Sequence, residues 1–209
     1  MTEAPPPRAP RFRRYTAAQR RQMLIEAGLR CLGEGGITSF TIDRICAEAG
    51  ASRGLVTHHF GSKDGLLAAC YTEMYDQALT LALPERGTDL GSMVVALFDD
   101  ALLGPGTLHA WLALWGEIGH NPELQAAHRL WYERFKSRVA ATIRATNRQA
   151  EPSVSPEALA VMFISLVDGL WLERWIDPEK MQREDAMAIC FDLLEAVLGP
   201  VQRPTAAPL

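Results

Sequence analysis

Two groups of residues in this chain have side chains whose types and spacing could do chemistry. The first group lies between residues 41 and 63 and combines small hydroxyl, basic and imidazole side chains, which can bind phosphates and base edges. Arg53 could read guanine through two parallel hydrogen bonds, and Gly54 beside it would let a backbone approach DNA closely. We interpret the following residues as a DNA-contact surface: Thr41, Arg44, Ser52, Arg53, Gly54, Thr57, His58, His59 and Lys63.

Roles within this surface follow from position. Arg53 is expected to read base edges, and the hydroxyl and imidazole side chains of residues 57–59 are expected to contact bases or backbone. Thr41, Arg44 and Lys63 flank the segment and are expected to anchor phosphates, which positions a protein without reading sequence.

Four tryptophans and one carboxylate form the second group. Trp111 and Trp115 are spaced i, i+4, as are Trp171 and Trp175, so the two rings of each pair share a helix face. Asp168 interrupts an almost wholly apolar segment, where a buried carboxylate needs compensation. One interpretation is a ligand site in which aromatic rings hold a cation, as they hold quaternary ammonium groups. The alternative is a structural aspartate, bonded to a helix cap or to an arginine of a partner subunit, among core or interface tryptophans.

Patterns typical of enzymes are absent from the sequence. It contains no phosphate-binding glycine loop, no His-x-x-x-His metal spacing and no nucleophile elbow. His58 and His59 are adjacent, which does not put both rings on one helix face. We therefore expect no catalytic residue, no metal site and no cofactor.

The elements that would position the first group read as two short helices joined by a glycine turn. Thr41 can cap the first helix, and the apolar residues between 42 and 49 recur at i, i+3, i+4 and i+7. Gly50 can end this helix in the left-handed conformation, Ser52 can cap the second helix, and Ser62 can cap a third. This order is typical of a helix-turn-helix, whose second helix enters the DNA major groove.

These residues resemble the N-terminal domain of TetR-family transcriptional regulators over roughly residues 16 to 70. The resemblance rests on Ser52 opening the recognition helix, Gly54 two places on, His59-Phe60 closing it, and Lys63-Asp64-Gly65-Leu66-Leu67 starting the next helix. It implies a DNA-binding regulator, typically a repressor released from a palindromic operator by a small-molecule effector.

One position and the second half of the chain are similar to the choline-responsive BetI-like branch of that family. Most members carry Tyr where this chain has Thr57, and a small hydroxyl residue there is more like the BetI type. Residues 111–124 and 166–172 resemble the ligand domain of that branch. The resemblance implies choline or another amine or cation as effector.

Charge is divided unevenly along the 209 residues. The net charge is −4, yet residues 1–70 hold ten Lys/Arg against six Asp/Glu while the remainder is strongly acidic. A basic half that carries a helix-turn-helix fits a DNA-facing module, although chance unevenness is the plain alternative. The four cysteines form no C-x-x-C pair, so we expect buried thiols in a reducing cytoplasm rather than a redox sensor.

The chain divides into four parts. Residues 1–15 are a basic arm that we expect to be disordered, touching DNA or merely solubilising; residues 16–62 are the DNA-binding domain; residues 63–199 are the ligand-binding and dimerisation domain; residues 200–209 are a tail. We expect an all-α protein, with a first helix capped by Thr16-Ala-Ala-Gln19 and ended by the glycines at 33–36. Further helices are expected at roughly 62–83, 90–103, 107–119, 121–147, 155–175 and 182–198.

Apolar stripes on the last two helices allow two interpretations. Leu159, Met162, Phe163, Leu166 and Leu170 mark one stripe, and Ile189, Cys190, Leu193, Leu194 and Val197 mark the other. They could build a two-fold four-helix interface or only the monomer core. Reading a palindrome needs a dimer, which favours the interface.

The function predicted from sequence is therefore a cytoplasmic regulator that is not an enzyme. Its expected partners are a double-stranded DNA operator, a small-molecule effector and a second copy of itself, and no membrane is involved, since no run of about 18 apolar residues occurs. The alternatives are an enzyme built on a helical bundle and a general DNA-architectural protein, against which the acidic second half argues. Activation rather than repression also stays open.

Overall fold

A computed structural model of the chain describes residues 15–83, 88–146 and 154–204. Within these ranges it consists of helices and contains no strand, which confirms the predicted all-α class. Most of the N-terminal arm (residues 1–14) and the last part of the tail (205–209) lie outside the described residues. The helices are α1 (Ala17–Ser39), α2 (Ile42–Ala49), α3 (Arg53–Phe60), α4 (Lys63–Ala82), α5 (Leu90–Leu97), α6 (Asp100–Leu103), α7 (Pro105–Ile118), α8 (Pro122–Thr146), α9 (Pro156–Ile176) and α10 (Arg183–Leu198).

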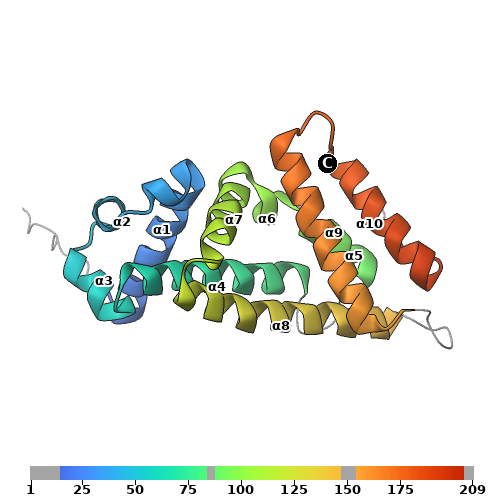
Figure 1. The fold of residues 1–209 in the computed structure, drawn as a ribbon, viewed down its shortest axis with the longest axis horizontal. Helices are drawn as coiled ribbons and strands as arrows, with labels where there is room; N and C mark the ends of the chain where they lie inside the picture. Colours follow the sequence, from blue (N-terminus) through green and yellow to red (C-terminus); the bar gives the residue numbers. More distant parts are fainter. Residues whose placement is uncertain (1–14, 84–87, 147–153, 205–209) are drawn as a thin grey trace, which may run out of the picture.

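The molecule is elongated, with α1–α3 at one end and α9 and α10 at the other (Figure 1). We call α1–α3 the head and the helices from α5 onward the body. The helix α4 begins in the head and runs beside α8 into the body, and both helices pack along much of their length. This helix of 20 residues, about 30 Å long, is therefore shared by the head and the body.

The head follows the local signals of the sequence closely. The predicted capping box is present, since the Thr16 hydroxyl accepts from the Gln19 backbone and the Gln19 side chain accepts from the Thr16 backbone. Thr41 caps α2 by accepting from the backbone N–H of Arg44. Gly50 ends α2 with φ 58° and ψ 37°, the left-handed conformation that glycine adopts without steric cost.

One local prediction for the head needs correction. Ser52 occupies the N-cap position of α3, but its side chain makes no capping hydrogen bond, so its hydroxyl is left for another partner. The predicted end of the first helix at residues 33–36 is confirmed, because the backbone of Gly35 and Gly36 is not helical. A further turn, which the sequence did not predict, follows to Ser39. Gly36 has φ 63°, so this break also uses the conformational freedom of glycine.

The body contains one boundary that periodicity missed. A single helix was expected over residues 90–103, but the chain leaves the helix at Phe98 and restarts at Asp100. Asp99 causes the restart, because its carboxylate accepts from the backbone N–H of Ala101 as an N-cap. Asn121 caps α8 in the same way through the backbone N–H of Leu124.

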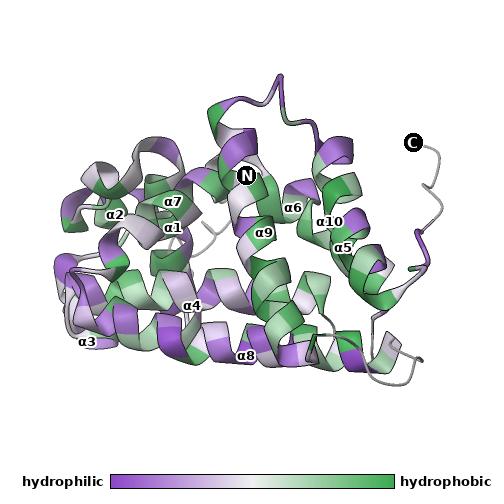
Figure 2. Cartoon of the chain, turned by 45° about the vertical axis from the view of Figure 1, so that its right-hand side comes forward, coloured by the Kyte–Doolittle hydropathy of each residue, from purple (hydrophilic) through white to green (hydrophobic). Residues whose placement is uncertain are grey.

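The apolar stripes predicted on the last two helices serve mainly the core of the monomer. Leu159, Phe163, Cys190 and Leu194 are completely buried within one chain. Two members of the predicted stripes, Met162 and Ile189, are exposed instead, together with four other large apolar side chains of α9: Val161, Leu172, Trp175 and Ile176. Figure 2 shows hydrophobic residues concentrated along α5, α9 and α10.

All four cysteines are free and buried, as predicted. Burial raises the pKa of the Cys190 thiol to about 12 and raises the pKa of Cys31, Cys46 and Cys70 as well. A redox-sensing thiol needs the opposite shift, so these residues are packing elements. Among the described helices none is both long and apolar enough to cross a membrane.

Candidate DNA-contact surface and aromatic ligand site

The helix α3 presents most of the predicted DNA-contact residues on one exposed face. Arg53, Gly54, Thr57 and His58 are exposed, and so are Ser52 before the helix and Lys63 after it. His59 is half-buried, with its ring edge toward Phe60 and His58. Val56 is buried and packs α3 against the rest of the head. Four of the predicted residues therefore share one exposed face of α3, with His59 at its margin.

The arginines of this surface are held by carboxylates of the head. Arg53 forms an ion pair with Asp43 of α2, and the two side chains are 73% and 66% exposed. Arg44 pairs with Glu34 and donates a hydrogen bond of 2.9 Å to the Ser39 hydroxyl. Exposed pairs of this kind are worth little in water, so either guanidinium can exchange its carboxylate for a base or a phosphate.

Gly54 has open space around its α-carbon. A methyl group built there would find only the Ser52 hydroxyl, at 4.0 Å. The fold of the head therefore does not require glycine at this position. A requirement for glycine would have to come from a molecule that approaches α3 from outside.

The start of α4 ties the head to the body. The Ser62 hydroxyl accepts from the backbone N–H of Gly65 and donates to the Glu123 carboxylate of α8 at 3.3 Å. A methyl group on Gly65 would lie 2.1 Å from the carbonyl oxygen of Phe60, so only glycine fits there. Lys63 lies on the outer side of this junction, with its ammonium 5.9 Å from the centre of the Phe40 ring.

Three of the four predicted tryptophans meet in the body. The ring centres of Trp115 and Trp171 are 6.5 Å apart with nearly parallel planes, and Trp111 lies 5.9 Å from Trp115 and 6.5 Å from Trp171. They come from α7 and α9, so the cluster exists only because these two helices pack together. Trp171 is fixed by an indole N–H that donates to the carbonyl of Leu97.

Two tyrosines of α4 complete this cluster, and sequence reasoning missed both. The ring of Tyr75 is 5.0 Å from Trp111 and the ring of Tyr71 is 5.7 Å from it, both nearly perpendicular. The Tyr71 hydroxyl is hydrogen-bonded to Nδ1 of His128 at 2.6 Å, and burial lowers the pKa of His128. Their i, i+4 spacing on the apolar face of α4 was the available signal. We call Tyr71, Tyr75, Trp111, Trp115 and Trp171 the aromatic cluster.

Asp168 is the acid of this cluster. Burial raises the pKa of Tyr71 and Tyr75, and the nearby charge of Asp168 raises both further. Burial also raises the pKa of Asp168 itself to about 7. Neither a hydrogen bond nor an ion pair reaches its carboxylate from the described residues, and no donor of a helix cap reaches it there. An uncompensated carboxylate near two rings of the aromatic cluster is a favourable setting for a cation.

Trp175 does not join the aromatic cluster. Its side chain is 48% exposed, and its ring lies 6.2 Å from that of His109 on α7. The shared spacing of the two tryptophan pairs therefore has two different outcomes. Trp111 and Trp115 both reach the cluster, whereas Trp171 turns inward and Trp175 marks the edge of the exposed apolar face of α9.

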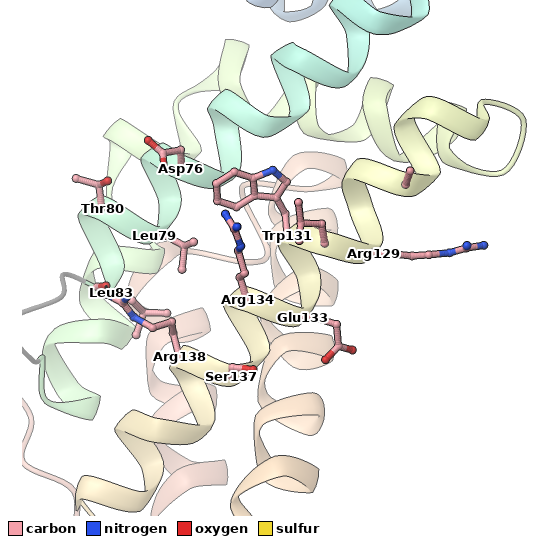
Figure 3. Close-up of a pocket in the computed structure, with 12 residues that line it drawn as sticks. Asp76, Leu79, Thr80, Leu83, Arg129, Trp131, Glu133, Arg134, Ser137 and Arg138 are labelled. Atoms are coloured by element: carbon pink, nitrogen blue, oxygen red, sulfur yellow. Dashed lines mark hydrogen bonds between the residues drawn. The ribbon is translucent and has the colours of Figure 1, made fainter.

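A wide groove of about 1130 Å³ lies between α4 and α8 on the outside of the cluster (Figure 3). Trp131 is on its floor and stacks on Tyr75 at 6.4 Å, so this tryptophan separates the groove from the cluster. The guanidinium of Arg134 lies 4.8 Å from the Trp131 ring centre, whereas Arg129 points away from the groove. The groove is open, and its arginines make it a poor place for a cation.

Two family models match the chain. The model described as bacterial regulatory proteins of the tetR family matches residues 24–70. The model described as a BetI-type transcriptional repressor, C-terminal, matches residues 87–199. The first match contains the recognition helix, and the second contains the three tryptophans and Asp168 of the cluster.

Similar proteins agree with these matches. The HTH-type transcriptional regulator BetI of Burkholderia mallei (strain NCTC 10229) is 31% identical over 188 residues, covering 87% of this chain and 94% of its own. That of Ectopseudomonas mendocina (strain ymp) is 31% identical over 189 residues, with 86% and 94% covered.

Solved structures show the same fold. A structure described as a transcriptional regulator from Pseudomonas aeruginosa PAO1 superposes with a TM-score of 0.75 at 30% identity, covering 88% of this chain and 92% of that one. A regulator from Saccharomonospora viridis, solved in complex with choline, superposes with a TM-score of 0.71 at 22% identity, covering 89% and 100%.

Proposed function

The chain belongs to the TetR family of transcriptional regulators, with a BetI-type C-terminal domain, and from this premise we propose that it is a repressor that a small organic cation releases from its operator. The observation that carries the proposal is the carboxylate of Asp168, which has no partner among the described residues and lies near Tyr71 and Tyr75 of the aromatic cluster. The family name covers DNA binding and regulation. The nature of the effector rests on this site.

A quaternary ammonium ion suits the site chemically. It carries a charge that Asp168 can balance and has no N–H that would need a hydrogen-bond acceptor, while aromatic faces attract it through their electron-rich π systems. The rings of Trp115 and Trp171 are nearly parallel. The ring of Tyr75 packs nearly perpendicular to that of Trp111. The similar structure from Saccharomonospora viridis holds choline, and we propose choline or a closely related amine for this chain.

The DNA-contact surface supplies the regulated activity in this proposal. Arg53 reads base edges after leaving Asp43, while Thr57 and His58 contact bases or backbone, with His59 at the margin. Ser52 and Gly54 lie where α3 meets DNA. Thr41, Arg44 and Lys63 hold phosphates.

The helix α4 connects the two sites. Tyr71 and Tyr75 stand in the aromatic cluster, while Lys63 at the start of the same helix stands at the DNA-contact surface. An effector that binds one arrangement of the cluster better than the other shifts α4, and through it the head, only by that difference in affinity. In the dimer, such a shift changes the spacing of the two heads and weakens operator binding.

We also propose a homodimer formed through the exposed apolar face of α9. Met162, Leu172, Trp175 and Ile176 are large, apolar and exposed on this one helix, and faces of this kind mark association sites. A two-fold dimer would match a palindromic operator. Sedimentation should show a dimer at micromolar concentration that Met162→Glu weakens, and a stable monomer of the unchanged protein would overturn this part.

Titration with choline tests the effector. Tryptophan fluorescence should change saturably, because three indoles form the site, and choline should weaken the binding of a DNA fragment selected by the protein from random sequence. The matched control is 3,3-dimethyl-1-butanol, which has the shape of choline without its charge and should bind far more weakly. Equal binding of both compounds, or no saturable change with folded protein, would contradict the proposal.

A further inference from the structure

The helix α7 connects the aromatic cluster with the head. It carries Trp111 and Trp115 of the aromatic cluster, and its first turns pack against α1 of the head. Figure 1 shows α7 standing between α1 and α9. This contact gives the body a second connection to the head, separate from α4.

The backbones of α1 and α7 touch at a pair of glycines. A methyl group built on Gly33 would lie 2.8 Å from the carbonyl oxygen of Gly106, closer than such atoms approach in real structures. A methyl group built on Gly106 would lie 3.9 Å from the Gly33 α-carbon, which is an ordinary contact. The helices are therefore in direct contact on the Gly33 side, with no side chain between them to absorb a movement.

His109 fastens the same contact with a hydrogen bond. Its Nδ1 lies 3.1 Å from the carbonyl oxygen of Gly33, and because a carbonyl only accepts, Nδ1 must carry the proton. Regular helix stops at Gly35, so carbonyls at this end of α1 lack helical partners. The imidazole of His109 supplies a hydrogen-bond donor for one of these carbonyls. The same ring also lies beside the ring of Trp175 on α9.

We infer that His109 is a positioning residue that holds the end of α1 to α7, so that effector binding reaches the head through α1 as well as through α4. His109 and Trp111 are two residues apart within one helix of 14 residues. A displacement of the rings of α7 therefore moves the imidazole with them, and the hydrogen bond and the glycine contact pull α1 along. The inference rests on the proposed function, because it describes how the cluster reaches the DNA-contact surface.

Two substitutions of His109 distinguish the effect of its hydrogen bond from the effect of its ring. His109→Ala removes both, whereas His109→Asn keeps a side-chain N–H close to the place of Nδ1 and loses only the ring beside Trp175. The measured quantity is the ratio of the operator Kd with saturating choline to the operator Kd without it. Allosteric coupling in proteins typically changes a binding affinity by roughly 5- to 150-fold. We expect His109→Ala to reduce this ratio at least about fivefold. His109→Asn should keep it within about twofold, as should the control His120→Ala at an exposed position just beyond the end of α7.

The glycine pair gives a second test that leaves the imidazole in place. Gly33→Ala pushes α1 away from α7 and should reduce the ratio as His109→Ala does. Gly106→Ala adds the same methyl group to the other side of the contact, where there is room, and should leave the ratio unchanged. Both alanines favour helix over glycine, so a difference between them reports the contact and not helix stability.

The choline Kd and the amide exchange of residues 37–40 distinguish the possible outcomes. We expect the choline Kd to stay unchanged in all these variants, since none lies in the aromatic cluster, and exchange to become faster in His109→Ala and Gly33→Ala. Ratios that stay within twofold in both folded variants would overturn the inference. Loss of coupling in His109→Asn as well would overturn the role of the hydrogen bond.

Failure of the proposed function would look different from failure of this inference. If choline does not bind the unchanged protein, the effector part of the proposed function fails, and amide exchange alone decides about His109. Faster exchange at residues 37–40 in His109→Ala and Gly33→Ala, but not in Gly106→Ala, would still support the positioning role. Unchanged exchange in both would overturn it.

Discussion

The DNA-contact surface and the aromatic cluster handle charge in opposite ways. On the surface, Arg53 and Asp43 pair in full view of solvent. In the cluster, Asp168 is half-buried near Tyr71 and Tyr75 and has no hydrogen-bond or ion-pair partner among the described residues. An exposed pair costs less than about 1 kcal/mol to open, so the surface can exchange partners freely. A buried, unpaired carboxylate is costly, so the cluster gains most from a ligand that brings the missing charge.

The DNA-contact surface could be predicted from the sequence, whereas the aromatic cluster could be predicted only in part. The surface is built from neighbours in the chain, within about 20 residues. The cluster needs α4, α7 and α9 to converge, and their contributions are up to 100 residues apart: Tyr71 and Trp171 are both within reach of Trp111. Local sequence signals define the DNA-contact surface, and the packing of helices defines the aromatic cluster.

The largest effect should come from neutralising the acid of the cluster. Asp168→Asn keeps the shape of the side chain and removes its charge, and losing one partner of a desolvated charge pair costs about 3 kcal/mol, or roughly 100-fold in affinity. Fluorescence titration should therefore show choline binding weakened at least about 100-fold. Operator binding without choline should be unchanged, because the DNA-contact surface is distant.

Glu173→Gln is the matched control for this experiment. Glu173 lies on α9 one and a half turns from Asp168 and is exposed, so its neutralisation removes the same charge from the same helix without touching the cluster. Choline affinity should change little. If Asp168→Asn and Glu173→Gln weaken choline equally, the contrast between buried and exposed carboxylates does not hold for ligand binding.

A smaller effect, on the other region, is expected for Arg53→Ala. Loss of a bidentate base contact costs roughly 1–3 kcal/mol, so operator affinity should fall about 5- to 150-fold and discrimination at one base pair should relax. Choline binding should not change. Gel shifts over a set of single-base operator variants measure both quantities.

The partner of Arg53 sharpens this test. Asp43→Asn removes the carboxylate that holds the guanidinium and should tighten operator binding a few-fold. Lys63→Ala, by comparison, should weaken binding to all sequences alike, since a phosphate contact carries no sequence information. An operator affinity that Arg53→Ala leaves intact would disprove the assignment of base reading to this residue.

Next in size are two opposite pH dependences, both from Asp168. Its pKa of about 7 in the folded chain lies above the unfolded value of about 3.9. Its contribution to stability is therefore complete below about pH 4 and is lost as pH rises to about 7, by at most about 1.4 kcal/mol per pH unit. Choline needs the carboxylate, so its affinity should rise about fivefold from pH 6 to pH 7 and by at most about another twofold above that.

Chemical denaturation and fluorescence titration between pH 5 and pH 8 measure these two slopes. Asp168→Asn should remove both of them together, because one proton is responsible for both. A stability slope that persists in Asp168→Asn belongs to other groups. A choline affinity that is flat with pH in the unchanged protein would show that Asp168 does not balance the cation.

Most of the head could be predicted from the sequence because caps and glycines act on their nearest neighbours. Thr16, Thr41 and Gly50 have the predicted roles. Ser52 is the exception, because a residue can occupy the N-cap position while its hydroxyl points elsewhere. The break at Phe98 was missed for a related reason: Asp99 caps a short helix in a segment whose apolar residues continue without interruption.

The cluster could be predicted only as far as helix faces allow. Asp168, Trp111, Trp115 and Trp171 were identified by composition and spacing, but spacing alone could not tell Trp171 from Trp175. Which residue turns inward depends on where α7 and α4 cross α9. The same limit applies to the apolar stripes of α9 and α10, since both faces of α9 are apolar and only packing shows which one is covered within the monomer.

The smallest expected effect, at Gly54, is also the one that most directly compares the chain alone with the chain on DNA. A methyl group fits at Gly54 without contact closer than 4.0 Å, and alanine favours helix over glycine by up to about 1 kcal/mol. Gly54→Ala should therefore leave the melting temperature equal or slightly higher. If the backbone of α3 approaches DNA closely, the same methyl group should weaken operator binding a few-fold.

Gly65→Ala is the contrasting control, because its methyl group would meet the Phe60 carbonyl inside the protein. It should lower the melting temperature and operator affinity together, whereas Gly54→Ala should separate them. Full operator affinity in Gly54→Ala would mean that α3 meets DNA through its side chains alone. In that case Arg53 and Thr57 would have to reach the bases from a backbone that stands further from the groove, and the glycine would serve neither the fold nor the contact.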